Sequence, residues 1–264
     1  MLITCFSTTV FSDQFPERQT SLSKEQKLIA ANLIGVSISI AWGLRYWNYG
    51  SSKPYIENDN WFQADSKHGG VDKLGHLYSS YGISHLLYYA YKDWGYSRSK
   101  AMLYGAISGF ALTTFSEIGD SISSHGFSIQ DWEMDFTGAV AAYLLLRYPG
   151  AQKLIDIRTQ YLPTPTTDDL LTDYERIKFL VAFKLSGIEQ LNTSLARYLE
   201  FHIGYYARGY ETEAAHPSRK VYAAVGINLS EILRTKTSWK KTAVALNYFQ
   251  LPFTYIDNKY NLNR

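Results

Sequence analysis

Acidic residues and histidines gather in three short clusters between positions 72 and 135, and these side chains have the types and spacing for chemistry. Long apolar segments separate the clusters. Charged groups are costly to place within apolar helices unless they are paired or bind a ligand. The clusters therefore predict one polar site on a hydrophobic helical scaffold. Its candidate members are Asp72, Lys73, His76, Glu117, Asp120, His125, Asp131 and Asp135.

Two active chemistries fit these residue types. Imidazole and carboxylate groups are the ligands that zinc, manganese and calcium use, so the site could hold a divalent metal cofactor. The candidate metal ligands are His76, Glu117, Asp131 and Asp135. The same groups could instead act as acid and base, without metal, to hydrolyse an envelope lipid or a cell-wall precursor. The candidate catalytic residues are then His76, Glu117 and Asp131.

The third interpretation is a structural or binding network. Asp72 would cap a helix, Lys73 would pair with an acid, and His76 would bond a carboxylate. The sequence has no nucleophile elbow, no zinc-protease helix and no phosphate loop. Whether the protein is an enzyme therefore stays open at this point, with a structural, lipid-binding or partner-binding role as the other choice.

Four helices are expected to position these residues, because apolar side chains recur at helical spacing on both sides of each cluster. Asp72 and His76 are four apart and so share one helical face. Ser128 can cap the last helix, with Asp131 three residues later in a variant of the capping box. The polar clusters lie at or near the ends of the second, third and fourth of these helices. The expected ranges are 24–47, 73–92, 99–119 and 129–147.

The first of these helices has two interpretations. Its apolar run, Leu28–Leu44, is slightly short for a membrane span. Arg45, Tyr46 and Trp47 follow it, and such side chains are typical of a membrane interface. A buried helix in a soluble bundle would have the same pattern, so spanning and packing remain equal alternatives.

The pattern changes to period two after residue 175. Segments 177–185, 199–206 and 221–229 alternate apolar and polar residues, which predicts antiparallel strands with one apolar face against the helices or against lipid. Segment 242–256 fits a helix or a strand. The expected fold class is α+β, an apolar four-helix bundle followed by a small antiparallel β-sheet. The expected divisions are a signal-like or disordered N-terminus over 1–20, a helical domain over 21–150, a linker over 151–175 and a β region over 176–264.

Composition limits the partners. A net charge of +2 does not favour nucleic acid, whereas 22 Tyr and 6 Trp favour membrane lipid. A protein partner or a second copy of the chain stays open. Leu2–Ser12 resembles a signal peptide without its basic start, and the residues that end at Cys5 resemble a lipoprotein acylation site. Cys5 is the single cysteine, so no internal disulfide forms.

The order of the motifs resembles the YfiM-like family of envelope lipoproteins over residues 61–146. It is more distantly similar to VanZ-like membrane proteins, which usually have Asn where Asp135 stands. Segment 199–210 also resembles the longer YfiM-like members. The resemblance implies a Gram-negative envelope location, at the outer membrane or on the periplasmic face, and implies no reaction. It rests on Asp72-Lys73-x-x-His76, on Glu117, and on Phe127-Ser128-x-x-Asp131-x-x-x-Asp135-x-x-Gly138-Ala139.

Overall fold

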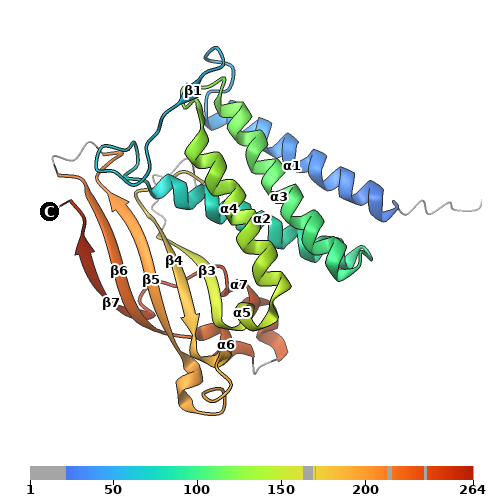
Figure 1. The fold of residues 1–264 in the computed structure, drawn as a ribbon, viewed down its shortest axis with the longest axis vertical. Coiled ribbons are helices and arrows are strands. Elements are labelled where there is room, and N and C mark those ends of the chain that lie inside the picture. Colours follow the sequence, from blue (N-terminus) through green and yellow to red (C-terminus); the bar gives the residue numbers. More distant parts are fainter. Residues whose placement is uncertain (1–21, 163–168, 170, 213–215, 235–236, 264) are drawn as a thin grey trace, which may run out of the picture.

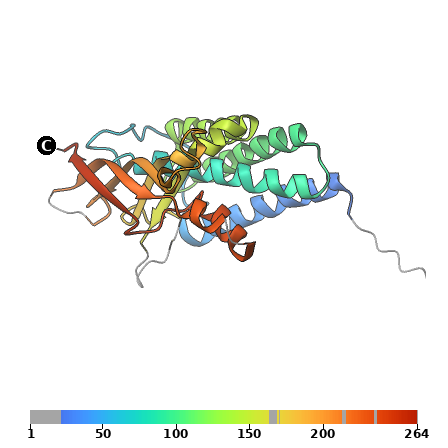
Figure 2. The same ribbon diagram turned by 90° about the horizontal axis from the view of Figure 1, so that it is seen from below.

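The computed structural model describes residues 22–162, 169, 171–212, 216–234 and 237–263. A layer of long helices and a curved sheet make up the molecule (Figure 1). Figure 2 shows the sheet at one end, with the long helices extending away from it. The signal-like segment and Cys5 lie outside the described residues. The long helices are α1 (Lys24–Tyr46), α2 (Val71–Asp93), α3 (Arg98–Asp120) and α4 (Ile129–Arg147).

Local sequence explains where these helices begin. Ser23 caps α1 in a reciprocal capping box with Gln26. Ser97 accepts a hydrogen bond from a backbone N–H in the first turn of α3, and Ser128 does the same for α4. Helix α2 follows Gly70, whose φ of 77° is a conformation that favours glycine. The four predicted helices are confirmed, and no end differs from its expected position by more than two residues.

Small residues let the helices of this layer approach closely. Helix α2 packs against both α3 and α4, and α1 packs against α3. A Cβ atom on Gly138 of α4 would lie 2.1 Å from the backbone oxygen of Leu77 in α2. A side chain there needs the two helix backbones to separate, because a backbone oxygen cannot rotate away.

Replacing Gly138 with alanine should therefore destabilise the fold by about 1–3 kcal/mol, the usual cost of overpacking. Gly82→Ala is the matched control, because Gly82 lies inside α2 with nothing within 4 Å of its added Cβ. That change should stabilise the protein by up to ~1 kcal/mol through helix propensity. Denaturant unfolding of the two variants, followed by circular dichroism, measures both effects. Equal responses would contradict the close approach of α2 and α4.

The sheet is an antiparallel meander in which each strand pairs with the next one along the chain. The mixed fold class and the strands predicted over 177–185, 199–206 and 221–229 are confirmed. The strands are β3 (Ile155–Tyr161), β4 (Ile177–Lys184), β5 (Leu199–Arg208), β6 (Ser218–Ile227) and β7 (Tyr255–Asn261).

One expectation about order was wrong. Strand β3 lies inside the predicted linker, 151–175, so the sheet begins earlier than expected. Short helices also separate β6 from β7. Segment 242–256 contains both the end of a helix and the start of a strand. The remaining elements are β1 (Ile56–Glu57), β2 (Phe127–Ser128), α5 (Pro149–Leu154), η1 (Leu185–Gly187), η2 (Leu195–Tyr198), α6 (Leu229–Arg234), η3 (Thr237–Trp239) and α7 (Lys240–Ala245).

The inner face of the sheet is buried and combines an apolar cluster around Leu180 and Tyr222 with a network of charged side chains. Arg158 donates to Asp156 at 2.7 Å, to Glu200 at 2.7 Å and to Gln250 at 2.8 Å. Each of these side chains is buried. Lys184 adds a second cation beside Asp156 at 2.6 Å. Ion pairs in such a setting hold only when every charge has a partner. The network therefore fixes the inner face of β3, β4 and β5.

The opposite face is apolar but only partly covered. Phe179 and Tyr205 on this face join a core cluster with Val71 of α2 and with Tyr174. Further along the strands the apolar side chains of the same face are exposed, and Ile203 is 56% exposed. The sequence predicted that this face packs on helices or lipid, and the structure shows helix packing for one part of it.

The free edge of β3 is covered by the segment that precedes β7. Thr159 donates its backbone N–H to the Tyr248 carbonyl at 3.0 Å, and its carbonyl accepts from Gln250 at 2.8 Å. The chain then continues as β7 along the opposite edge of the sheet. The last part of the chain therefore covers the edge of β3 and also supplies β7, the strand at the other edge.

Candidate functional site

Three helix ends meet at the candidate site: α2 and α4 begin there, and α3 ends there. Acids in the first turns of α2 and α4 are favoured by the positive ends of those helices. Helix α2 contributes Asp72, Lys73 and His76, α3 contributes Glu117 and Asp120, and α4 contributes Asp131 and Asp135.

A short connection holds the end of α3 against the start of α4. Strands β1 and β2 pair in parallel and bring the segment before α2 next to the turn before α4. The Ser128 N–H donates to Glu117 Oε2 at 3.1 Å, and the Ser128 hydroxyl accepts from the Asp131 N–H at 3.2 Å. Ser128 therefore orients the Glu117 carboxylate of α3 and fixes the backbone at Asp131 in the first turn of α4.

Lys73 organises one half of the site. Its side chain is fully buried, and its ammonium pairs with Asp72 at 2.9 Å, with Asp131 at 2.9 Å and with Asp59. Burial lowers the pKa of Lys73, but the charges of Asp72 and Asp131 outweigh that effect and raise the pKa above its ordinary value. Lys73 therefore remains charged and balances part of the acid around it.

His76 organises the other half. Its Nδ1 lies 3.3 Å from Asp135 Oδ1, and its Nε2 lies 3.5 Å from Glu117 Oε1 and 4.0 Å from Asp131 Oδ2. Burial lowers the pKa of His76, but Asp131 and Asp135 more than offset this and leave it well above its usual value. The His76 side chain is 22% exposed, whereas that of Asp135 is 0% exposed. Solvent therefore reaches the site at His76.

The site holds more acid than base. Six carboxylates face two cationic groups, Lys73 and His76. Burial raises the pKa of Glu117 to about 8 and that of Asp120 to about 7, and in both cases His76 opposes the effect of burial. Burial also raises the pKa of Asp135. Such acids must either keep a proton at neutral pH or have a cation beside them.

Four buried carboxylate oxygens of the site have no hydrogen-bond partner within the described part of the chain: Asp72 Oδ1, Asp120 Oδ1, Asp131 Oδ1 and Asp135 Oδ2. Of these, Asp131 Oδ1 lies 2.9 Å from the Lys73 ammonium. Two sets of three side chains bring ligand atoms within 4.8 Å of one another. One set is Asp59, Asp72 and Asp131, but the Lys73 ammonium already lies among these acids. The other set is His76, Glu117 and Asp135. This second set offers one nitrogen and carboxylate oxygens, which suits zinc or manganese.

The structure brings together every predicted site residue except His125. His125 lies next to Lys67, with Nδ1 3.2 Å from Nζ, and the described residues give it no contact with the other site residues. Burial and the Lys67 charge lower its pKa to about 4. Asp120 lies at the periphery and forms no ion pair among the described residues, although the charge of His76 acts on it.

Sequence reasoning missed Asp59, which lies in the loop before α2 and pairs with Lys73. The run Asn58-Asp59-Asn60 is typical of a turn, so the sequence predicts only a loop there. One sequence signal could have identified Asp59. It is an acid that shortly precedes a helix, and the first turn of that helix contains Asp72 and Lys73. Nothing in the local pattern states that the loop folds back onto that helix.

The matched range of a known family coincides with this site. Residues 58–147, which are 90 of 264 residues, match the model of a family described as predicted periplasmic lipoprotein (DUF2279). Comparison with curated proteins and with solved structures gave no match. The matched range begins just before Asp59 and ends with α4, so it contains every residue of the site. The match supports an envelope, periplasmic location and a likeness to envelope lipoproteins.

Proposed function

We propose that this envelope protein binds one divalent transition metal ion through His76, Glu117 and Asp135. The observation that carries the proposal is the Oδ2 atom of Asp135, which is fully buried and without a hydrogen-bond partner among the described residues. A buried polar atom in this state costs free energy, and a bound cation would remove that cost. The surplus of acid over base at the site supports the same conclusion.

The residues around the three ligands have distinct supporting roles. The Ser128 N–H holds one oxygen of Glu117 and leaves Oε1 directed at His76. Lys73 already lies between Asp72 and Asp131, so the second acidic group has a cation beside it and competes less for the ion. A metal at His76 would take a ring nitrogen without its proton, so binding must release protons.

The purified protein should contain about one zinc or manganese ion per chain, and His76→Ala and Asp135→Asn should each abolish it. The loss in affinity should exceed the roughly 10–100-fold that follows loss of a supporting residue. Affinity should rise as pH increases through the pKa of Glu117, about 8, because the ligands must lose protons before they bind metal.

Elemental analysis and competition with a chelator on either side of that pH measure both effects. Asp257→Asn is the control, because Asp257 is an acid of β7, far along the chain from the site. Metal content that His76→Ala leaves unchanged would contradict the proposal. In that case the cluster would be the protonated structural network.

A second candidate is a hydrolase that acts on an envelope lipid or a cell-wall precursor at the same site. It is favoured by the exposed part of His76 and by the pKa of Glu117, about 8, which suits a general acid–base near neutral pH. Hydrolysis of a lipid or peptidoglycan ester that is lost in Glu117→Gln, with the fold retained, would establish it.

We also propose that α1 holds the protein at a membrane, at the outer membrane or on the periplasmic face. Helix α1 is long and apolar enough to cross a membrane, and Gly43 is the one residue of the helix that is buried. A core helix of this composition would be mostly buried. After cell fractionation the protein should pellet with membranes and require detergent for release. Release by high salt alone would contradict this assignment.

A further inference from the structure

The apolar face of the sheet packs on α2 in one part only, and we call it the outer face. In its uncovered part it carries seven exposed apolar side chains, which we call the apolar strip. Four of them are aligned across neighbouring strands by the register, and Ile256, the last of these, is 85% exposed. Leu199 and Ile227 pair at the end of the strip. The strip consists of Phe183, Leu199, Phe201, Ile203, Val225, Ile227 and Ile256.

This arrangement reverses that of a water-exposed sheet. The charged residues Arg158, Glu200 and Asp156 face inward and are buried, while the apolar residues of the same strands face outward. Strands that contact lipid place apolar side chains outward, and strands that contact water place polar ones there. A contiguous exposed apolar surface marks an interaction site.

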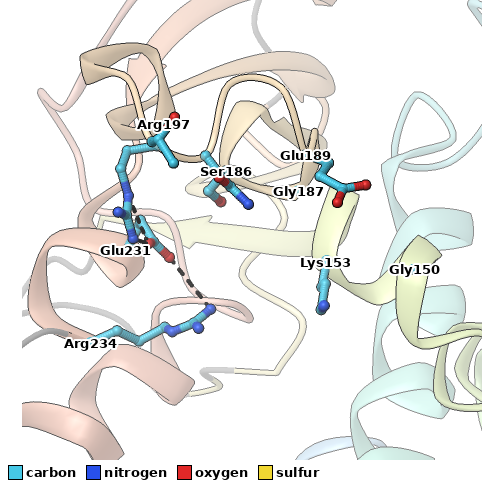
Figure 3. Close-up of a pocket in the computed structure, with 10 residues that line it drawn as sticks. Gly150, Lys153, Ser186, Gly187, Glu189, Arg197, Glu231 and Arg234 are labelled. Atoms are coloured by element: carbon cyan, nitrogen blue, oxygen red, sulfur yellow. Dashed lines mark hydrogen bonds and ion pairs between the residues drawn. The ribbon is translucent and has the colours of Figure 1, made fainter.

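A cleft lies where β5 begins and β6 ends, next to the strip. It has a volume of about 650 Å³, and its lining includes three basic side chains, Lys153, Arg197 and Arg234, and two acidic ones, Glu189 and Glu231. Figure 3 shows Glu231 between the two arginines and Lys153 on the opposite wall. Glu231 pairs with Arg197 and, at 3.4 Å, with Arg234, which leaves other guanidinium N–H groups free to donate. Lys153 has no ion pair within the described part of the chain.

The cleft and the strip are close enough for one amphiphile. Arg197 is two residues before Leu199, in the short helix η2 that leads directly into β5. We infer that the outer face of the sheet lies on a lipid leaflet, with the phosphate of an anionic phospholipid in the cleft and its acyl chains along the strip. The inference rests on the membrane association proposed for α1, and it assigns a second contact on a different part of the chain.

The charge of the cleft favours a lipid over a second copy of the chain. Burial of the strip in a dimer would leave the three basic residues without a role. An anionic phospholipid offers both an apolar chain and a phosphate, which arginine and lysine bind through charge-assisted hydrogen bonds. Ser186, Asn192 and Thr193 line the same cleft and add neutral donors.

Environment-sensitive labels on the full chain test the inference. In a Cys5→Ser background, Ile203→Cys and Ile256→Cys place a label on the strip, and Lys259→Cys places one on the opposite face of β7. Each protein is reconstituted in phosphatidylcholine vesicles, with or without phosphatidylglycerol, that contain nitroxide-labelled lipid. With anionic lipid present, we expect quenching and blue-shifted emission at 203 and 256 and neither at 259.

The combined change Lys153→Gln and Arg234→Gln tests the cleft. It should raise the anionic lipid fraction needed for half-maximal quenching at position 203 by about tenfold. The control, Lys53→Gln with Lys100→Gln, removes the same charge from exposed positions outside the sheet and should leave that fraction unchanged. Both pairs avoid Arg197, whose loss would leave Glu231 buried beside one partly exposed partner.

Three results would overturn the inference. Labels at 203 and 256 that remain in water, while the protein still pellets with membranes, would reject the sheet contact and leave the role of α1 intact. If quenching at position 203 depends neither on the anionic lipid fraction nor on the Lys153→Gln and Arg234→Gln changes, the headgroup site is rejected. Labels shielded without vesicles, in a particle of twice the molar mass, would assign the strip to a second copy of the chain.

Discussion

Lys73→Met is expected to destabilise the protein by about 3–5 kcal/mol, the typical cost of removing one partner of a buried ion pair. The Lys73 side chain is fully buried, and its ammonium is the cation that pairs with Asp59, Asp72 and Asp131. Methionine fills a similar volume but removes this charge. Asp59 and Asp72 then have no cationic partner among the described residues, and Asp131 keeps only His76, at 4.0 Å. Denaturant unfolding at neutral pH measures the loss.

Two comparisons separate this effect from a general cost of mutation. Lys92→Met changes an exposed lysine of the same helix and should alter stability by less than about 0.5 kcal/mol. Acidification should recover part of the loss in Lys73→Met, because protonated carboxyl groups need no cation beside them. A loss in Lys73→Met that is small and insensitive to pH would mean that the carboxylates find other partners.

Arg158→Met should have an effect of similar size in the sheet, about 3–5 kcal/mol. Arg158 contacts Asp156, Glu200 and Gln250 on the buried inner face, and each loses a charge-assisted hydrogen bond. Lys184 still pairs with Asp156, whereas Glu200 loses the guanidinium and keeps only the imidazole of His202, at 2.8 Å, so Glu200 has the greater loss. The change in midpoint of chemical unfolding measures the effect.

A second substitution identifies the charge responsible. Adding Glu200→Gln to Arg158→Met removes the carboxylate that lost its partner and should restore part of the stability, so the two changes should not be additive. Lys259→Met is the control, because Lys259 forms an exposed pair with Asp257, and such pairs contribute at most about 1 kcal/mol. Strict additivity would contradict the coupling between Arg158 and Glu200.

The long helices could be predicted because their signals are local. Ser23 and Ser128 are N-caps that act within one turn, and apolar spacing marks the length of each helix. Acids at the ends of apolar helices also predicted that His76, Glu117 and Asp131 meet, since a core cannot hold them apart. The sequence could not predict which side chains pair with each other. Asp131 could have paired with Lys73 or with His76, and in the structure it lies near both.

The sheet shows the limit of the same reasoning. Period-two alternation identified β4, β5 and β6, but it does not tell which face is covered. Asp156 and Arg158 of β3 lie in the segment predicted to be a linker, 151–175, where two prolines and several Thr and Asp residues over 161–173 are typical of a connection. Their burial depends on Glu200, which is 42 positions from Arg158 along the chain. Such a pairing is a property of the folded sheet and has no local signature.

The covered edge of β3 has a consequence for the order in which the chain folds. The hydrogen bonds between Thr159 and the segment at Tyr248 and Gln250 join distant positions, and such contacts form late. During synthesis, α2, α3 and α4 can assemble while β3 still has an unpaired edge, which is a template for aggregation. Inward-pointing charges are a known protection for such edges. Asp156 and Arg158 would therefore protect the growing chain from its neighbours before they stabilise the finished sheet.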